Sequence, residues 1–272
     1  MPVRRATILG LAAAAVALVL APGAHDAGAQ SAKDAKYRAG DKYTGYTYAD
    51  PTTQAMQDDD HANPGFLWLD EAEKLWAKAE GAAGKSCADC HGKAGQSMKQ
   101  VGATYPKWQE KIGKLQNVEM RINQCRADNM KAEPWKWEAR ELVAMTAYIR
   151  NQSRGLPLNV DTSGPAKAHL ANGEKLFYTR HGQLDLSCAN CHEDNSGNWI
   201  RGDLLGQAQA NGFPTYRLRE QYLVSLQFRL IGCVRDTRAE PYAFGSDEYL
   251  DLELYLAHRG QGLPIEVPSV RR

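Results

Sequence analysis

Hydrophobic residues recur at helical spacing in three segments of the chain, residues 64–80, 138–150 and 246–258. In the first two segments this spacing predicts helices with one apolar face. The third is hydrophobic at so many positions that we expect burial on most of its sides. Gly81 closely follows the first segment and provides a stop signal. The pattern therefore predicts a mainly α-helical protein.

The chain also contains an internal repeat. Two Cys-x-x-Cys-His motifs begin at Cys87 and Cys188, 101 residues apart. Each is preceded by Glu-Lys-Leu and followed by an aromatic-Pro pair, an Arg-x-x-x-Cys sequence, Ala-Glu-Pro and a closing Gly-Leu-Pro. The same features in the same order indicate duplication. We predict domains at residues 65–157 and 166–268, joined by a turn-rich linker at 158–165. Residues 30–64 show little helical periodicity and are predicted to form an extended N-terminal arm.

The first 29 residues resemble a secretory signal peptide. Arg4 and Arg5 precede an apolar run at residues 8–20, and Ala27-Gly28-Ala29 fits a cleavage site. The alternative, a membrane anchor, is disfavoured because a spanning helix needs about 20 apolar residues. No later segment approaches that length, so we expect a mature protein without a membrane span, located in the periplasm.

Composition narrows the class of protein. Hydrophobic residues make up 43% and charged residues 24% of the 272-residue chain, which is typical of a soluble globular protein. The formal net charge is +1, so bulk charge gives no indication of nucleic-acid binding.

The two motifs carry the main candidate chemistry. Paired cysteines at this spacing attach one haem covalently, and the adjacent histidine ligates its iron. We therefore predict two haem c groups, attached at Cys87 and Cys90 and at Cys188 and Cys191, with His91 and His192 as the iron ligands. The alternative is a zinc site of four cysteines. It would span two domains and gives no reason for the two histidines, so two tandem cytochrome c-like domains are the better interpretation.

Elimination suggests the ligands opposite these histidines. Methionine and histidine are the usual choices, but the second domain contains no methionine, and His169 and His181 precede its motif while His258 ends its last helix. Cys125 and Cys233 follow their motifs at similar distances, so we predict both as axial thiolates.

Two alternatives remain at these positions. A Cys125–Cys233 disulfide suits an oxidising compartment, and Met120 or Met130 could ligate the first haem. A thiolate ligand lowers the reduction potential of haem iron. If exposed, it also provides reactive sulfur.

Arg229 precedes Cys233 by about one helical turn. A guanidinium at this position can lower a thiolate's pKa and hold a small sulfur oxyanion. The alternative is a structural pairing with a carboxylate or a haem propionate.

Taken together, these residues resemble the SoxA family, the dihaem subunits of the SoxAX cytochromes of bacterial thiosulfate oxidation. The resemblance rests on both Cys-x-x-Cys-His motifs, on Cys125 and Cys233, and on Arg229, and it covers the whole mature chain. It implies that Cys233 is the catalytic cysteine, carried as a persulfide on the second haem iron. It also implies that Arg229 binds the substrate anion and that Cys125 ligates the first haem.

The implied activity is that of an L-cysteine S-thiosulfotransferase, which couples thiosulfate oxidatively to a cysteine of the carrier protein SoxYZ. The implied partners are the monohaem cytochrome SoxX, in a heterodimer, and a small cytochrome c that accepts the electrons. Two other functions remain open: a thiosulfate dehydrogenase that forms tetrathionate, and a non-catalytic electron carrier.

Overall fold

The computed structural model describes residues 2 and 35–272. The predicted signal peptide lies outside the described residues, except for residue 2. Within the part of the chain that the structure describes, no helix is long and apolar enough to cross a membrane.

Helices dominate the structure, as the sequence predicts, with short strands between them. The helices are α2 (Pro51–Asp58), α3 (Gly65–Ala77), α4 (Cys87–His91), α5 (Ala94–Ser97), α6 (Val118–Cys125), α7 (Arg140–Asn151), α8 (Ala166–Tyr178), α9 (Cys188–His192), α10 (Leu226–Asp236) and α11 (Asp247–Arg259). Short 3₁₀ helices are η1 (Gly45–Tyr48) and η2 (Val101–Ala103), and η3 (Arg126–Met130) is a π-helical turn. The strands are β1 (Arg38–Ala39), β2 (Lys42–Tyr43), β3 (Lys107–Gln109), β4 (Lys114–Gln116), β5 (Trp199–Ile200), β6 (Asp203–Leu204), β7 (Thr215–Arg217), β8 (Tyr222–Val224) and β9 (Ser269–Arg271).

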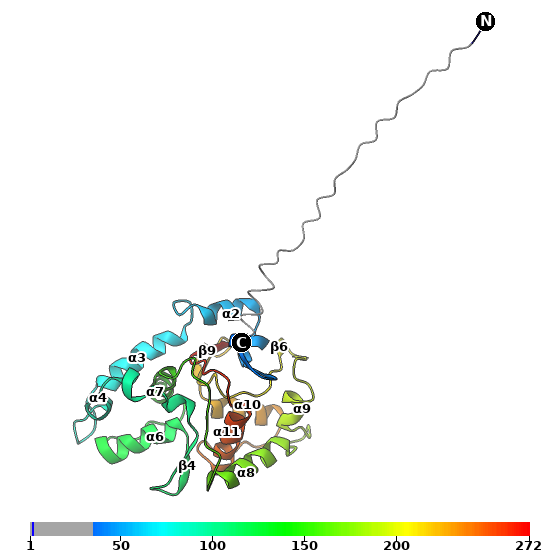
Figure 1. Cartoon of the computed structure of the whole chain (residues 1–272). Helices are drawn as coiled ribbons and strands as arrows, with labels where there is room; N and C mark the ends of the chain where they lie inside the picture. The colour runs from blue at the N-terminus through cyan, green and yellow to red at the C-terminus, as the bar shows by residue number, and fades with distance from the viewer. Residues whose placement is uncertain (1, 3–34) are drawn as a thin grey trace.

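The two halves of the chain repeat the same arrangement. In the first half α3 packs against α7, and in the second half α8 packs against α11. Each half also has a one-turn motif helix (α4 or α9), a β-hairpin (β3–β4 or β7–β8) and a helix that carries its remaining cysteine (α6 or α10). Figure 1 shows α3, α4, α6 and α7 on one side of the molecule and α8 to α11 on the other. The predicted mainly α, tandem cytochrome c-like fold is confirmed.

The second helix pair makes a close backbone contact at a glycine. Ala72 of α3 is fully buried, and Gly173 occupies the corresponding position of α8. A Cβ atom on Gly173 would lie 2.0 Å from the carbonyl oxygen of Asp251 on α11. Glycine is therefore required here by the close approach of two helices rather than by a turn.

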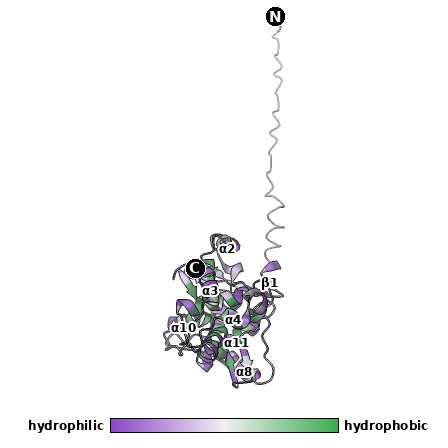
Figure 2. Cartoon of the chain, turned by 90° about the vertical axis from the view of Figure 1, so that its left-hand side faces the viewer, coloured by the Kyte–Doolittle hydropathy of each residue, from purple (hydrophilic) through white to green (hydrophobic). Residues whose placement is uncertain are grey.

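The two halves share a continuous core. Leu158 and Val160 of the predicted linker are 1% and 3% exposed, and the Leu158 amide donates to the Leu263 carbonyl at 2.8 Å. They belong to one buried cluster with Val143 of α7 and Leu254 of α11. Along the helices, hydrophobic and hydrophilic residues interleave, as amphipathic packing requires (Figure 2). The linker is thus packed between the halves.

The described part of the N-terminal arm lies against the second half. The side-chain amide of Asn63 donates to the Pro268 carbonyl at 2.8 Å, and the Val270 amide donates to Gln57 Oε1 at 3.0 Å. The last strand, β9, pairs in parallel with β7. The arm contains η1 and α2, which the hydrophobic pattern did not predict, because both helices are short. The side chains of Thr44 and Asp50 cap them.

Candidate functional site

Reciprocal capping bonds fix both Cys-x-x-Cys-His motifs. In the first, Ser86 Oγ accepts from the Asp89 amide at 3.1 Å and the Ser86 amide donates to Asp89 Oδ2 at 2.7 Å. Ser187 and Asn190 make the same pair of bonds at 3.3 and 3.0 Å in the second. A capping box satisfies the free amides at a helix start. Each motif is therefore held as one helical turn, which presents two thiols and a histidine together.

The first motif opens onto a cavity of about 290 Å³. Cys87, Cys90 and His91 lie in its wall, and Cys125 lines it from the end of α6. The remaining lining is largely apolar and includes Trp76, Met98, Ile122, Met145 and Ile149. An apolar cavity with two thiols, an imidazole and a further thiol has the donor set that covalent haem requires, so the residues fit this group.

The electrostatics of the first cavity suit iron ligation. Burial lowers the pKa of His91, and the nearby charge of Arg121 lowers it further. The neutral imidazole, which is the metal-binding form, is therefore favoured. Burial raises the pKa of Cys125, while Arg121 acts in the opposite direction. A cationic iron would supply the stabilisation that a thiolate at Cys125 needs.

The second motif has a similar environment. Burial raises the pKa of Cys188 to about 12, and Cys233 adds to the shift. Burial and then Cys233 likewise raise the pKa of Cys191, whereas Arg229 lowers it. Coulombic influence weakens with distance, so these shifts place Cys233 and Arg229 near the motif. The structure brings all five predicted residues of the second site together.

A single helix sets the spacing of Arg229 and Cys233. The helix α10 begins after Ser225, whose hydroxyl accepts from the Phe228 amide at 3.1 Å. Arg229 and Cys233 both fall within it, one turn apart, as the sequence predicts. Both side chains therefore emerge on one face of α10.

The predicted proximal histidine of the second site, His192, has a defined orientation. Its Nδ1 lies 2.7 Å from the Gly206 carbonyl oxygen, to which it donates as N–H. This bond leaves Nε2 free for a metal. Burial lowers the pKa of His192, which further favours the neutral ring.

The structure also bears on the alternatives for Cys125 and Cys233. Both cysteines are free thiols, and each lies beside the motif of its own domain. Met120 packs against the core between the two halves, whereas Met130 lines the first cavity. Among the described residues, no group of three or more histidine, cysteine or acidic side chains is arranged to hold a metal ion.

One structural residue of the first site was missed from the sequence. Arg126, which directly follows Cys125, is 6% exposed and stacks on Trp135 at 3.7 Å. It also lines the first cavity. The repeated Ala-Glu-Pro sequence before Trp135 was the available signal, but it gave no indication that an arginine would be buried against the ring.

Two helical domains, each with a Cys-x-x-Cys-His turn beside a further cysteine, define a c-type cytochrome with covalent haem c. A family model described as the SoxA/TsdA cytochrome c domain matches residues 71–158 and 172–265. The chain therefore belongs to the SoxA family of these cytochromes, as its relatives also show.

These relatives match most of the chain. The L-cysteine S-thiosulfotransferase subunit SoxA of Pseudaminobacter salicylatoxidans is 48% identical over 231 residues, covering 84% of this chain and 80% of that protein. The corresponding subunit of Rhodovulum sulfidophilum is 46% identical over 228 residues, covering 84% of this chain and 79% of that protein. The crystal structure of SoxXA from P. pantotrophus matches with a TM-score of 0.83 at 44% identity, covering 85% of this chain and 87% of that one.

Proposed function

We propose that this protein is the SoxA subunit of an L-cysteine S-thiosulfotransferase that joins thiosulfate to a cysteine of SoxYZ. In this reaction the carrier thiol and the outer sulfur of thiosulfate form an S–S bond, with release of one proton and two electrons. The single observation that carries the proposal is the grouping of Cys233 and Arg229 beside the second Cys-x-x-Cys-His motif. Membership of the SoxA family supports it.

The site residues have distinct roles in this proposal. Cys87 and Cys90 attach one haem and Cys188 and Cys191 attach another, and each haem, when bound, supplies an electron acceptor. The iron ligands are His91 and Cys125 in the first domain, and His192 and Cys233 in the second.

In this proposal, two residues of the helix α10 bind the substrate and act on it. The Arg229 guanidinium holds the sulfonate end of thiosulfate through paired hydrogen bonds. The sulfur of Cys233 lies one turn away and handles the transferred sulfur. Arg229 is partly buried, and the lower dielectric of a partly buried site strengthens the attraction between its guanidinium and the anion.

The proposed cellular location follows from the export signal, and the proposed partner follows from the relatives. Residues 1–29 direct the chain to the periplasm, where the signal is removed. SoxX binds as a monohaem partner in a heterodimer, by analogy with the SoxXA protein of P. pantotrophus. A small cytochrome c receives the electrons.

The decisive experiment begins with the intact mass of the native protein and a peptide map around Cys233. The assembled complex is then incubated with thiosulfate, SoxYZ and oxidised cytochrome c, and the mass of the carrier peptide is measured. We expect two haems on this chain and a thiosulfonate adduct on the SoxYZ cysteine that requires Cys233. A carrier that stays unmodified while cytochrome c is reduced would contradict the proposal.

A control without SoxYZ separates the two other functions. A thiosulfate dehydrogenase would form tetrathionate from thiosulfate alone, whereas the proposed transferase requires the carrier. A non-catalytic electron carrier would modify no sulfur compound in either arm, and replacing Cys233 would then change only the haem potential.

A further inference from the structure

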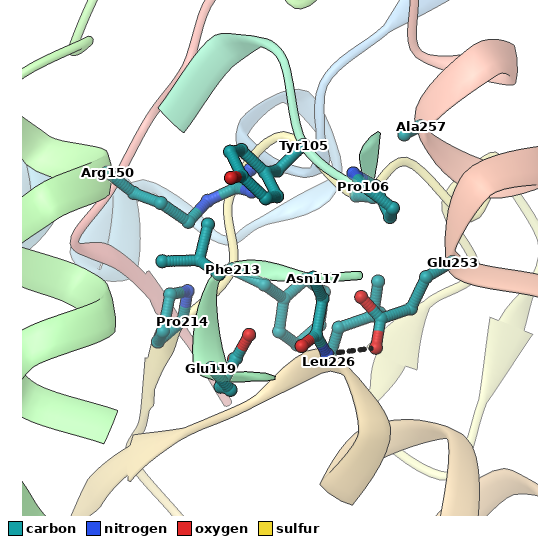
Figure 3. Close-up of a pocket in the computed structure, with 12 residues that line it drawn as sticks. Tyr105, Pro106, Asn117, Glu119, Arg150, Phe213, Pro214, Leu226, Glu253 and Ala257 are labelled. Carbon is teal, nitrogen blue, oxygen red and sulfur yellow. Dashed lines mark hydrogen bonds between the residues drawn. The ribbon is translucent and has the colours of Figure 1, made fainter. Parts of the chain in front are cut away.

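A small polar cavity of about 20 Å³ lies between the two domains. Asn117, Glu119 and Arg150 line it from the first domain, and Glu253 and Phe213 line it from the second (Figure 3). A cavity of this size holds about one water molecule when polar groups surround it. None of the predicted haem ligands lines it.

Three charged side chains converge on this cavity. Glu119 on α6, Arg150 on α7 and Glu253 on α11 are 8%, 9% and 6% exposed. The Asn117 side-chain amide donates to Glu253 Oε1 at 3.0 Å, drawn as the dashed line in Figure 3. The buried Nε of Arg150 has no hydrogen-bond partner within the described protein.

The charges in this cluster do not balance unless a proton is present. Two carboxylates and one guanidinium carry a net charge of −1, and a single added proton makes the group neutral. A buried net charge is costly in a low-dielectric interior, so this cluster binds a proton more readily than an isolated surface carboxyl group does.

The surroundings of the cluster also favour a protonated carboxyl group. Burial, followed by the charge of Glu253, raises the pKa of Glu119 to about 8, and Arg150 opposes the shift. Burial raises the pKa of Glu253 to about 7, against the hydrogen bonds of Gln227 and Asn117 and the charge of Arg150. Glu138, in the segment before α7, also raises the pKa of Glu119. One carboxyl group is therefore poised to gain or lose a proton near neutral pH.

The cluster is linked to the first haem cavity by shared walls. Tyr105 and Val118 line both cavities. The helix α6 carries Glu119 in its first turn and Cys125 at its end. An electron that enters the first cavity adds negative charge there, and negative charge increases the proton affinity of buried carboxylates nearby.

We propose that Glu119, Glu253 and Arg150 form a proton-binding site, which takes up a proton from solvent when an electron enters the first haem and releases it on reoxidation. One electron reduces ferric to ferrous iron and one proton converts a carboxylate into a carboxylic acid, so the total charge of the protein is unchanged. A one-electron donor that reaches the first haem supplies the electron. This inference rests on the proposed function for haem attachment at Cys87 and Cys90.

The test is a spectroelectrochemical titration of both haem midpoint potentials in the full protein. It runs between about pH 6 and pH 9, a range that includes the raised pKa values of Glu119 and Glu253. We expect one potential to fall as the pH rises. Glu119→Gln, which resembles the protonated side chain, should remove this dependence, and Glu253→Gln should weaken or remove it. Glu141→Gln is the matched control, because Glu141 is an exposed residue of α7.

Potentials that do not change with pH, or a pH dependence that persists in both cluster variants, would overturn the inference. If the variants do not fold, the infrared difference spectrum of the native protein replaces them. Reduction at about pH 8 should then generate the carbonyl band of a protonated carboxyl group, and its absence would also overturn the inference. A protein without haem absorbance would instead refute the proposed function.

Discussion

The guanidinium of Arg126, which lines the first cavity, lies 2.6 Å from the carboxylate of Glu80. Its Nε also donates to the Glu133 carbonyl at 3.1 Å, and its plane stacks on Trp135. Arg126 directly follows Cys125, whereas Glu80 precedes the motif helix α4. The ion pair thus joins the segment before the predicted proximal ligand, His91, to the segment after the predicted distal ligand, Cys125.

Glu80→Gln should destabilise the first domain. Arg126 would keep a buried charge without its carboxylate partner, and breaking a buried ion pair costs several kcal/mol. Because Glu80 is partly exposed, we expect a smaller loss of about 2 kcal/mol in the free energy of unfolding. Chemical denaturation followed by haem absorbance would measure it. Glu133→Gln is the control, since Glu133 accepts from Arg126 through its backbone carbonyl, and an equal loss there would refute the explanation.

The same ion pair should make stability depend on pH. The hydrogen bonds of Lys78 and Arg126 lower the pKa of Glu80 below its ordinary value of 4.5. A lowered pKa stabilises the folded state above the ordinary pKa, and this contribution is lost as pH falls below about 4.5. The native protein should lose more stability than Glu80→Gln between about pH 5 and pH 3. Parallel denaturation curves for the two proteins across this range would contradict the prediction.

Cys233→Ala and Cys125→Ala should have different effects. Cys233→Ala should reduce modification of SoxYZ by at least about 100-fold, the scale of losing a nucleophilic group. Both variants should retain covalent haem, because the attachment thiols are intact, and each should change the absorption spectrum of one haem. Cys125→Ala should retain most of the transfer activity. Equal loss of activity in both variants would indicate that the two cysteines have structural roles only.

Arg229→Gln should weaken thiosulfate binding. A hydrogen bond to a charged group contributes about 1.5–3 kcal/mol, so we expect KM for thiosulfate to rise by roughly 10- to 100-fold. Arg121→Gln is the matched control, because Arg121 precedes Cys125 by the same four residues and its guanidinium donates to Gln124. If both variants raise KM equally, Arg229 is not the anion-binding residue.

Gly173→Ala should destabilise the second domain through a steric clash. The new Cβ would meet the backbone of Asp251 at 2.0 Å, so α8 and α11 would have to separate. Overpacking of this kind typically costs about 1–3 kcal/mol. Thermal unfolding would measure the loss, with Glu174→Ala at the adjacent exposed position as the control. An unchanged midpoint in Gly173→Ala would mean that the two helices approach less closely.

The sequence predicted the elements of this protein well, because its signals are local. Helical spacing identified α3, α7 and α11 to within a few residues, and the repeated motifs identified the duplication. It also predicted Arg229 and Cys233 on one helix, since a four-residue separation matches the helical period. Short elements such as α2 were not predicted, because a two-turn helix has too few apolar positions to be distinguished from a loop.

The sequence by itself determined the cytochrome class, and it predicted the haem-attachment residues and the candidate sulfur-handling pair, all of which are short patterns along the chain. Only the tertiary structure decided that Arg126 stacks on Trp135, that the linker is buried, and that Glu119, Arg150 and Glu253 meet between the domains. The last two residues are more than 100 positions apart. Their proximity depends on how the helices of the two domains pack, and burial then changes the chemistry of charged side chains that look like ordinary surface residues in the sequence.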